Sequence, residues 1–123
     1  MPALGVDEIL GFQVQRFRAM RMWSAFFAEH PIMLSPTWAH PAFAHGDDIA
    51  ASATGAMLDT LRPVLPANIL GLPAAVVPGG VADGLPVGIQ VMGDRYTDLR
   101  CLTVAAEIEA SVGRITPIDP VFN

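Results

Sequence analysis

The chain has 123 residues, of which 52% are apolar and 15% are charged. This balance fits one soluble globular unit and excludes disordered, collagen-like and disulfide-rich proteins. The net charge of -5 at pH 7 disfavours nucleic acid and anionic membranes as partners, because phosphate groups are bound by clustered cations.

Three further features of the composition narrow the kinds of protein that this chain could be. All seven basic residues are arginines, so the chain contains no lysine. Cys101 is the only cysteine, which excludes an intrachain disulfide. Together with the lack of a recognisable leader or long apolar run, this predicts a cytoplasmic protein. The mean hydropathy is +0.44, and few residues are charged. We therefore expect some apolar surface to be buried against another part of a larger protein.

Apolar residues predict a long helix over residues 7–29, because they recur at spacings of three, four or seven. The positions are Ile9, Phe12, Ala19, Trp23 and Phe26. Asp7 is the predicted N-cap. His30 and Pro31 end the helix, because proline cannot continue the hydrogen-bond ladder.

The segment "PIMLSPT", residues 31–37, is an apolar run between prolines and predicts a buried strand. Residues 38–48 are rich in proline, glycine and aspartate and predict a loop. A helix is expected over residues 49–61, with Asp47 or Asp48 available to cap it.

A second helical segment is predicted over residues 63–70, ended by Gly71, since glycine is favoured at a left-handed C-cap. Two runs rich in β-branched residues, 74–78 and 86–92, predict antiparallel strands. The intervening "GGVADGL" supplies the glycines of a wide hairpin turn.

Thr97 is the predicted cap of a last helix that runs to Val112 and is closed by Gly113. The order helix, strand, helix, helix, strand, strand, helix predicts an α/β fold in which helices pack on a small mixed sheet. The sequence shows no repeat and no linker, so residues 1–123 are expected to form a single unit.

Residue types that often carry chemistry have simpler interpretations here. His30, His40 and His45 match no zinc-binding spacing, so no metal is expected. The pair 47–48 is better explained as a helix cap than as an acid/base pair. The "GGVADG" of residues 79–84 lacks a following helix and a P-loop lysine, so a turn is favoured over a phosphate cradle.

Nucleophilic catalysis requires a serine or cysteine with a base held against it. The candidates lie in apolar or helical surroundings, and none stands in a tight glycine-flanked turn. They are Ser24, Ser35, Ser52, Ser111 and Cys101. The sequence therefore predicts no catalytic residue and no cofactor, and Cys101 is expected to be a small core residue.

Residues 66–113, "PANILGLPAAVVPGGVADGLPVGIQVMGDRYTDLRCLTVAAEIEASVG", closely resemble the C-terminal segment of the amidase signature family. In that family a GLP motif and a later GLPVG–Q motif are followed by a last helix. Upstream, "HPIMLSPTWAHPAFAHGDDIA" resembles the family's buried strand and proline-rich loop. The late "TPIDP", residues 116–120, resembles the tail of a bacterial subgroup close to indoleacetamide hydrolases.

This resemblance implies part of an α/β/α sandwich around a mixed sheet, from an enzyme that hydrolyses carboxylic amides to an acid and ammonia or an amine. Family catalysis uses a serine, a cis-serine and a lysine that must be kept neutral by its surroundings. This chain has no lysine and no glycine/serine-rich loop. We therefore expect the C-terminal portion of an amidase, inactive alone, whether a truncated gene product, a proteolytic remnant or a deliberately made piece.

A few residues are expected to line the substrate pocket of a complete enzyme, because open α/β sheets bind ligands beyond the carboxyl ends of strands. Pro36, Thr37 and Trp38 are the main candidates, with Met57 and Asn68 as weaker ones. Core packing is the simpler explanation for Trp38 and Met57. For Asn68, the favoured explanation is that it holds the backbone together near a helix end.

Two alternatives remain open at this point. The chain could be a stand-alone, non-enzymatic dimerisation or interaction module built on the amidase scaffold, or a small-molecule carrier with a closed apolar pocket. For an amidase portion and for a module alike, we expect self-association or binding to the missing N-terminal amidase portion, through strand edges and uncovered helix faces. A small amide substrate is expected only for the complete enzyme.

Overall fold

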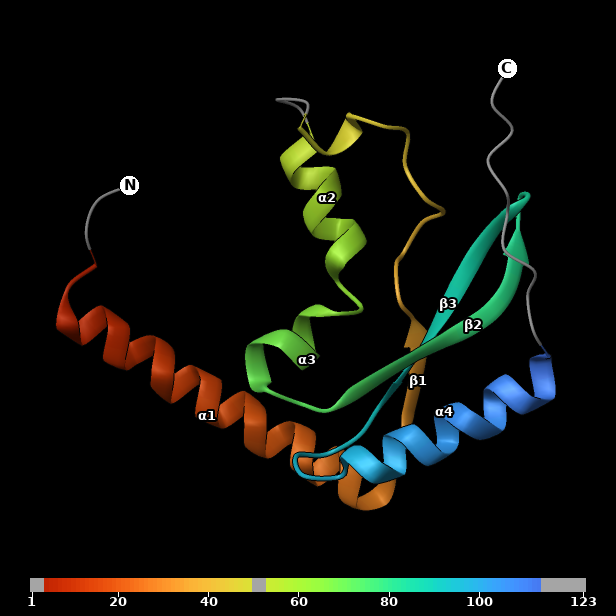
Figure 1. Cartoon of the computed structure of the whole chain (residues 1–123). Coiled ribbons are helices and arrows are strands. Elements are labelled where there is room, and N and C mark those ends of the chain that lie inside the picture. Colours follow the sequence, from red (N-terminus) through yellow and green to blue (C-terminus); the bar gives the residue numbers. More distant parts are fainter. Residues whose placement is uncertain (1–3, 50–52, 114–123) are drawn as a thin grey trace.

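The computed structural model describes residues 4–49 and 53–113. Its elements follow the predicted order (Figure 1). They are α1 (Val6–Glu29), β1 (Met33–Pro36), the short 3-10 helix η1 (Asp47–Ile49), α2 (Ala53–Leu61), α3 (Leu65–Leu70), β2 (Ala74–Ala82), β3 (Leu85–Met92) and α4 (Asp98–Val112). The "TPIDP" motif at residues 116–120 lies outside the described residues.

The three strands form one sheet in the order β1-β3-β2. Both pairings are antiparallel. In the β1–β3 pair Met33 lies opposite Met92, and in the β2–β3 pair Ala82 lies opposite Leu85. The α/β fold is confirmed, but the described sheet is antiparallel where a mixed one was predicted. The reason is that β1 and β2 run in the same direction but are not neighbours, because β3, which runs the opposite way, lies between them.

The turn between β2 and β3 is tight, and the wide glycine turn predicted from the sequence is wrong. Only Asp83 and Gly84 separate the paired residues, and both have positive φ, 53° and 78°. Aspartate and glycine tolerate that conformation, and its twist matches the twist of the flanking strands. The earlier glycines instead allow a register shift between Pro78 and Gly80, so β2 continues past its proline.

Strand β1 is an edge strand of the described sheet, whereas the sequence predicted a buried one. It pairs with β3 alone, and Leu34 is 55% exposed. Helix α4 packs mainly over β2 and β3, so it leaves this side chain of β1 uncovered. The apolar run is typical of a strand covered on both faces, and the described part of the chain does not supply that cover.

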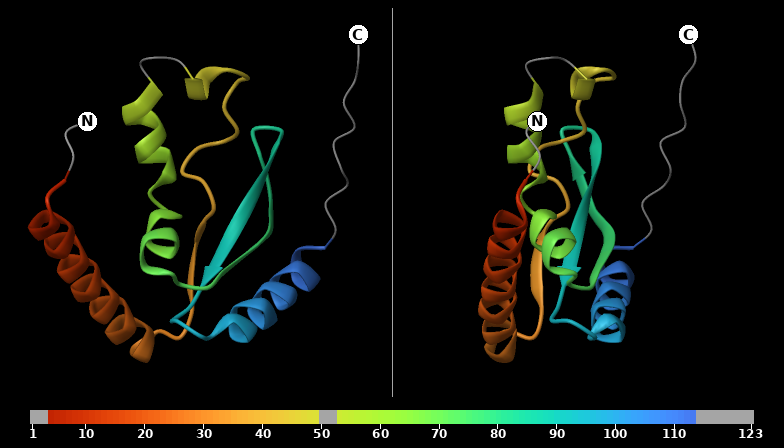
Figure 2. Two further views of the ribbon diagram at one scale, coloured as in Figure 1. Left: turned by 60° about the vertical axis from the view of Figure 1, so that its left-hand side comes forward. Right: turned by 90° about the vertical axis from the view of Figure 1, so that its left-hand side faces the viewer.

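The sheet lies between two helical layers, with α1 and α3 on one face and α4 on the other (Figure 2). Neighbouring residues of a strand point to opposite faces, so β3 contributes to both cores. Met92 packs in the first core, and Val91 packs in the second. Their buried partners are Met20, Phe27, Leu70 and Leu72 in the first core, and Val77, Cys101 and Ala105 in the second.

The start of α1 differs from the prediction. The helix begins at Val6 with Gly5 as its N-cap, and Asp7 lies in the first turn. The Glu8 carboxylate accepts the Gly5 backbone N–H at 2.8 Å, which satisfies a donor at the helix start and places the cap two residues before Asp7. Asp7 still lies near the positive end of the helix dipole.

The other helix ends are largely as predicted. His30 ends α1, and Gly71 ends α3 in the left-handed conformation at φ 68°. Thr97 takes the N-cap position of α4, but its hydroxyl donates to the Asp94 carbonyl at 2.6 Å and caps no helix N–H. Asp47 lies in η1, and the residues directly before α2 lie outside the described residues, so the predicted cap of α2 stays a prediction.

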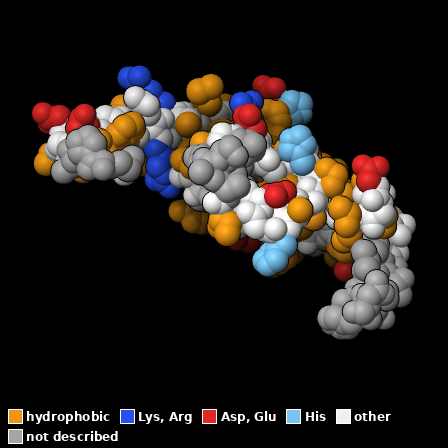
Figure 3. Space-filling model, turned by 90° about the horizontal axis from the view of Figure 1, so that it is seen from above, with side chains coloured by type: hydrophobic (Ala, Val, Ile, Leu, Met, Phe, Trp, Pro, Cys, Tyr) orange, Lys and Arg blue, Asp and Glu red, His pale blue; other side chains and the backbone are white. Residues whose placement is uncertain are grey.

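Much apolar surface stays exposed, above all on α1. Phe17 is 58% exposed, and other large apolar side chains of this helix are exposed on several sides. They are Val6, Ile9, Leu10, Phe12, Val14, Met22 and Phe26. Hydrophobic side chains (orange) reach the surface along the length of the molecule (Figure 3). No helix among the described residues is both long enough and apolar enough to span a membrane.

Met92 should be essential to the stability of the chain. It is fully buried between β3, α1 and α3, so Met92→Ala is expected to lower the free energy of unfolding by about 2–5 kcal/mol in urea titrations. Met22→Ala is the matched control, because Met22 is 73% exposed, and its effect should stay within about 0.5 kcal/mol. Equal effects of the two substitutions would contradict the two-layer core.

The thiol of Cys101 should make the free energy of unfolding decrease at alkaline pH. Burial raises the pKa of this thiol above its ordinary value, partly offset by its hydrogen bond with Thr97. A raised folded-state pKa leaves stability intact below the unfolded pKa, about 8.5, and reduces it as pH rises further. Urea titrations at neutral and alkaline pH should show a larger loss for the natural chain than for Cys101→Ala. Parallel losses would disprove the linkage.

Candidate functional site

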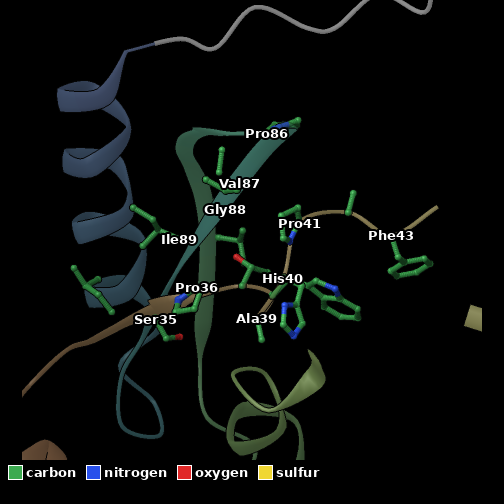
Figure 4. A pocket seen from close by; sticks show the side chains of 16 residues that line it. Ser35, Pro36, Ala39, His40, Pro41, Phe43, Pro86, Val87, Gly88 and Ile89 are labelled. Carbon is green, nitrogen blue, oxygen red and sulfur yellow. The ribbon is translucent and has the colours of Figure 1, made fainter. Parts of the chain in front are cut away.

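A hollow lies beside the first half of β3, because β1 is shorter than the strand it pairs with. Residues Met33–Pro36 cover only residues 89–92 of β3. Thr37 adds one further hydrogen bond, from its N–H to the Gly88 carbonyl at 3.1 Å, and the chain then leaves the sheet. The loop of residues 37–43 runs past Pro86, Val87 and Gly88 and borders an open hollow of about 940 Å³ (Figure 4).

The lining of this hollow is apolar and aromatic. The rings of Trp38 and Phe43 lie 6.2 Å apart with their planes tilted by 37°. Most other lining side chains are proline or aliphatic. They include Pro36, Pro41 and Pro86, and Leu34, Val76, Val87 and Ile89. Ser35, Thr37 and His40 are polar, and none of the lining residues is Asp, Glu, Lys or Arg.

Two hydrogen bonds fix the end of α2 and the segment that follows it against this region. The Ala39 N–H donates to the Thr60 carbonyl at 3.3 Å. Gln90, only 2% exposed, donates from Nε2 to the Pro63 carbonyl at 3.0 Å and to Ser35 Oγ at 3.1 Å. The buried amide of Gln90 therefore connects β3, β1 and the α2–α3 segment.

The hydroxyl of Thr37 lies directly over Gly88. A Cβ placed at Gly88 would come within 2.7 Å of Thr37 Oγ1 and 3.3 Å of Val76 Cγ1. Glycine is therefore required at position 88 for Thr37 to lie flat on the strand. Among the described residues, Thr37 Oγ1 is the buried side-chain polar atom without a hydrogen-bond partner.

The structure brings together three of the five residues predicted for a pocket wall. Pro36, Thr37 and Trp38 all line the hollow. Asn68 is exposed on α3 and is not among the lining residues; its backbone N–H donates to the Val64 carbonyl at 3.2 Å. Met57 belongs to α2, but its side chain lies outside the described residues. A role in substrate binding stays a prediction for all five.

Sequence reasoning missed the β3 side of the hollow, which comprises Pro86, Val87, Gly88 and Ile89, and the second aromatic ring, Phe43. A usable signal was the length difference between a short strand ended by proline and the longer strand of a hairpin. That signal requires knowing that β1 pairs with β3. Within the described part of the chain, no three His, Cys, Asp or Glu side chains are grouped to hold a metal ion.

Comparison with known proteins identifies the family. The Amidase family pattern matches residues 9–102, which is most of the chain. The chain belongs to the amidase signature family. It is 36% identical over 96 residues to an indoleacetamide hydrolase from Bradyrhizobium japonicum and 38% identical over 84 residues to a glutamyl-tRNA(Gln) amidotransferase subunit from Lacticaseibacillus casei. These alignments cover 76% and 68% of this chain, but 21% and 17% of the relatives.

Solved structures agree with the sequence comparison. A bacterial aryl acylamidase of the amidase signature family superimposes with a TM-score of 0.66 at 26% identity, over 88% of this chain and 24% of that one. The glutamyl-tRNA(Gln) amidotransferase subunit from Thermotoga maritima gives 0.64 at 27% identity, over 86% and 27%. The family resemblance and the α/β fold predicted from the sequence are confirmed, and the chain spans about a fifth of the length of these curated relatives.

Gln90 should contribute to stability through its buried amide. Gln90→Leu leaves the Pro63 carbonyl and Ser35 hydroxyl without their donor, so we expect a loss of about 1–3 kcal/mol in the free energy of unfolding. Gln13→Leu on the exposed side of α1 is the matched control and should change it by less than about 0.5 kcal/mol. A neutral Gln90→Leu would show that these hydrogen bonds contribute no net stability.

Proposed function

We propose that this chain is the C-terminal scaffold portion of an amidase, which in its complete form hydrolyses a carboxylic amide to an acid and ammonia or an amine. The observation that carries the proposal is the family match over residues 9–102, which corresponds to only about a fifth of the curated relatives. The chain contains no lysine, whereas the family's catalysis requires one. Alone it is therefore inactive, and its substrate is an amide only within the complete enzyme.

The exposed apolar side chains of α1 and of β1 support a partner that buries them. A monomeric protein rarely exposes so large an apolar surface, whereas an internal face of a larger fold does. The proposed partner is the N-terminal amidase portion. The free, buried thiol of Cys101 is compatible with a reducing, cytoplasmic compartment.

A stand-alone dimerisation or interaction module is the second candidate. The same observation favours it, because a second copy of the chain could bury the α1 surface and the edges of the described sheet at β1 and β2 as well as an amidase portion could. The two candidates differ in what restores activity: only the scaffold portion completes an enzyme.

A chimera tests the proposal. Residues 9–102 replace the matched segment of the Bradyrhizobium indoleacetamide hydrolase, and ammonia release from indoleacetamide is measured. The chimera should hydrolyse the amide, while the chain alone should release no ammonia above background. A folded chimera without activity, together with a discrete homodimer of the isolated chain in sedimentation, would instead support the interaction module.

The α1 surface supplies an internal control. Phe17→Asp should change the stability of the isolated chain little, because Phe17 is 58% exposed there, but it should abolish folding or activity of the chimera, where burial of an unpaired charge is costly. Phe17→Leu should be tolerated in both. An active Phe17→Asp chimera would show that α1 does not face the amidase portion.

A further inference from the structure

We propose that the hollow between the loop of residues 37–43 and the first half of β3 binds the uncharged, ring-bearing apolar part of a small molecule, and that Gly88 sets its depth. The identification of this small molecule as the amide substrate rests on the proposed function. The binding itself follows from this chain's own residues.

The backbone at this edge is unsuited to a further strand. Residues of an antiparallel strand face a given neighbour alternately. Because the Thr37 N–H bonds the Gly88 carbonyl, the next residue of β3 that faces this side is Pro86, which has no N–H to donate. Proline at such a position blocks strand addition. The hollow is therefore better suited to a ligand than to an extended peptide.

The lining selects against charge. No Asp, Glu, Lys or Arg is among the lining residues, so a charged ligand group would lose its hydration without gaining an ion pair, at a large cost in free energy. Small-molecule sites typically combine an apolar lining with a few polar groups. Here Ser35 and His40 provide those few groups, whereas the hydroxyl of Thr37 is buried against Gly88.

The aromatic pair favours a ring. Trp38 and Phe43 extend from the same loop with their rings tilted by 37° and 6.2 Å apart. Phe43 is 47% exposed, so a planar apolar ligand would remove aromatic surface from water and add ring–ring contacts. Figure 4 shows Phe43 and Pro41 on the loop opposite Val87 and Gly88 on β3.

Gly88 limits how far Thr37 extends into the hollow. With hydrogen at position 88, Thr37 lies against the strand; a methyl group there would lie 2.7 Å from its hydroxyl oxygen and 3.3 Å from Val76 Cγ1. Gly88 is paired with Pro78 on one side and accepts the Thr37 N–H on the other, so these contacts hold the β3 backbone in place. We therefore expect the Thr37 side chain to turn away from the strand and project into the hollow, which reduces the space for a ligand.

The test is a titration of the 123-residue chain, followed by amide chemical shifts, with phenol, toluene and benzoate. Phenol and toluene should bind saturably and shift the signals of Thr37, Trp38 and Gly88, whereas benzoate should not. Gly88→Ala should weaken both neutral probes by at least about fivefold. Gly11→Ala is the matched control, because a Cβ at Gly11 meets no atom within 4 Å.

Two further variants keep the test decisive if Gly88→Ala unfolds the chain. Gly88→Ala combined with Thr37→Ala removes the clashing oxygen and should recover binding. Trp38→Leu should weaken both neutral probes, whereas Phe12→Leu on exposed α1 should not. Equal affinity for benzoate, no effect of Gly88→Ala in a folded chain, or shifts confined to the second hollow at Met22, Trp23, Phe26 and Met33 would overturn the proposal.

The outcome is independent of the chimera experiment. An inactive chimera with intact probe binding would contradict the proposed function and leave the binding site standing. An active chimera with no probe binding would support the proposed function and contradict the binding site. If the probes fail and Trp38→Leu weakens association with the N-terminal amidase portion, the occupant is a polypeptide and the proposal is wrong.

Discussion

The pairing of β3 with strands on both sides is the constraint on which the rest of the structure depends. It lies between β1 and β2, and its alternating side chains enter both cores, Met92 on the α1 side and Val91 on the α4 side. The same strand contributes Gln90, whose amide holds the α2–α3 segment, and Gly88, over which Thr37 lies. Helices, loop and hollow are all positioned relative to this one strand.

Because of two prolines, only the second half of β3 pairs with β1, and its first half borders the hollow. Pro36 closes β1 after four residues, and Pro86 removes the donor that a longer neighbour would need. The result is a short edge strand, one extra hydrogen bond from Thr37, and then an open hollow. A site in this position requires no catalytic group of its own. In the proposed role, it supplies shape and apolar contact to a bound small molecule.

The distribution of apolar residues combines two buried cores with a large exposed apolar surface. The two small cores include fully buried residues such as Val91 and Met92. Helix α1 contributes only Met20 and Phe27 to its buried set, although apolar residues surround it. Burial of the remaining apolar surface would stabilise the chain further, and that burial depends on atoms outside the two described cores.

The sequence by itself determined the element order, the ends of most helices and the family, because these depend on local signals: apolar spacing, the glycine at position 71, the threonine at 97 and the GLP motifs. Three features were decided only by tertiary structure. The tight turn at Asp83 and Gly84 depends on how far β2 stays paired, and the edge position of β1 depends on which strands lie beside it. The hollow depends on a length difference between β1 and β3 that matters only once they pair. Pro36, Thr37 and Trp38 could be predicted from the loop after a strand, whereas Phe43, Pro86 and Gly88 could not, because their proximity arises from long-range register, which no local pattern encodes.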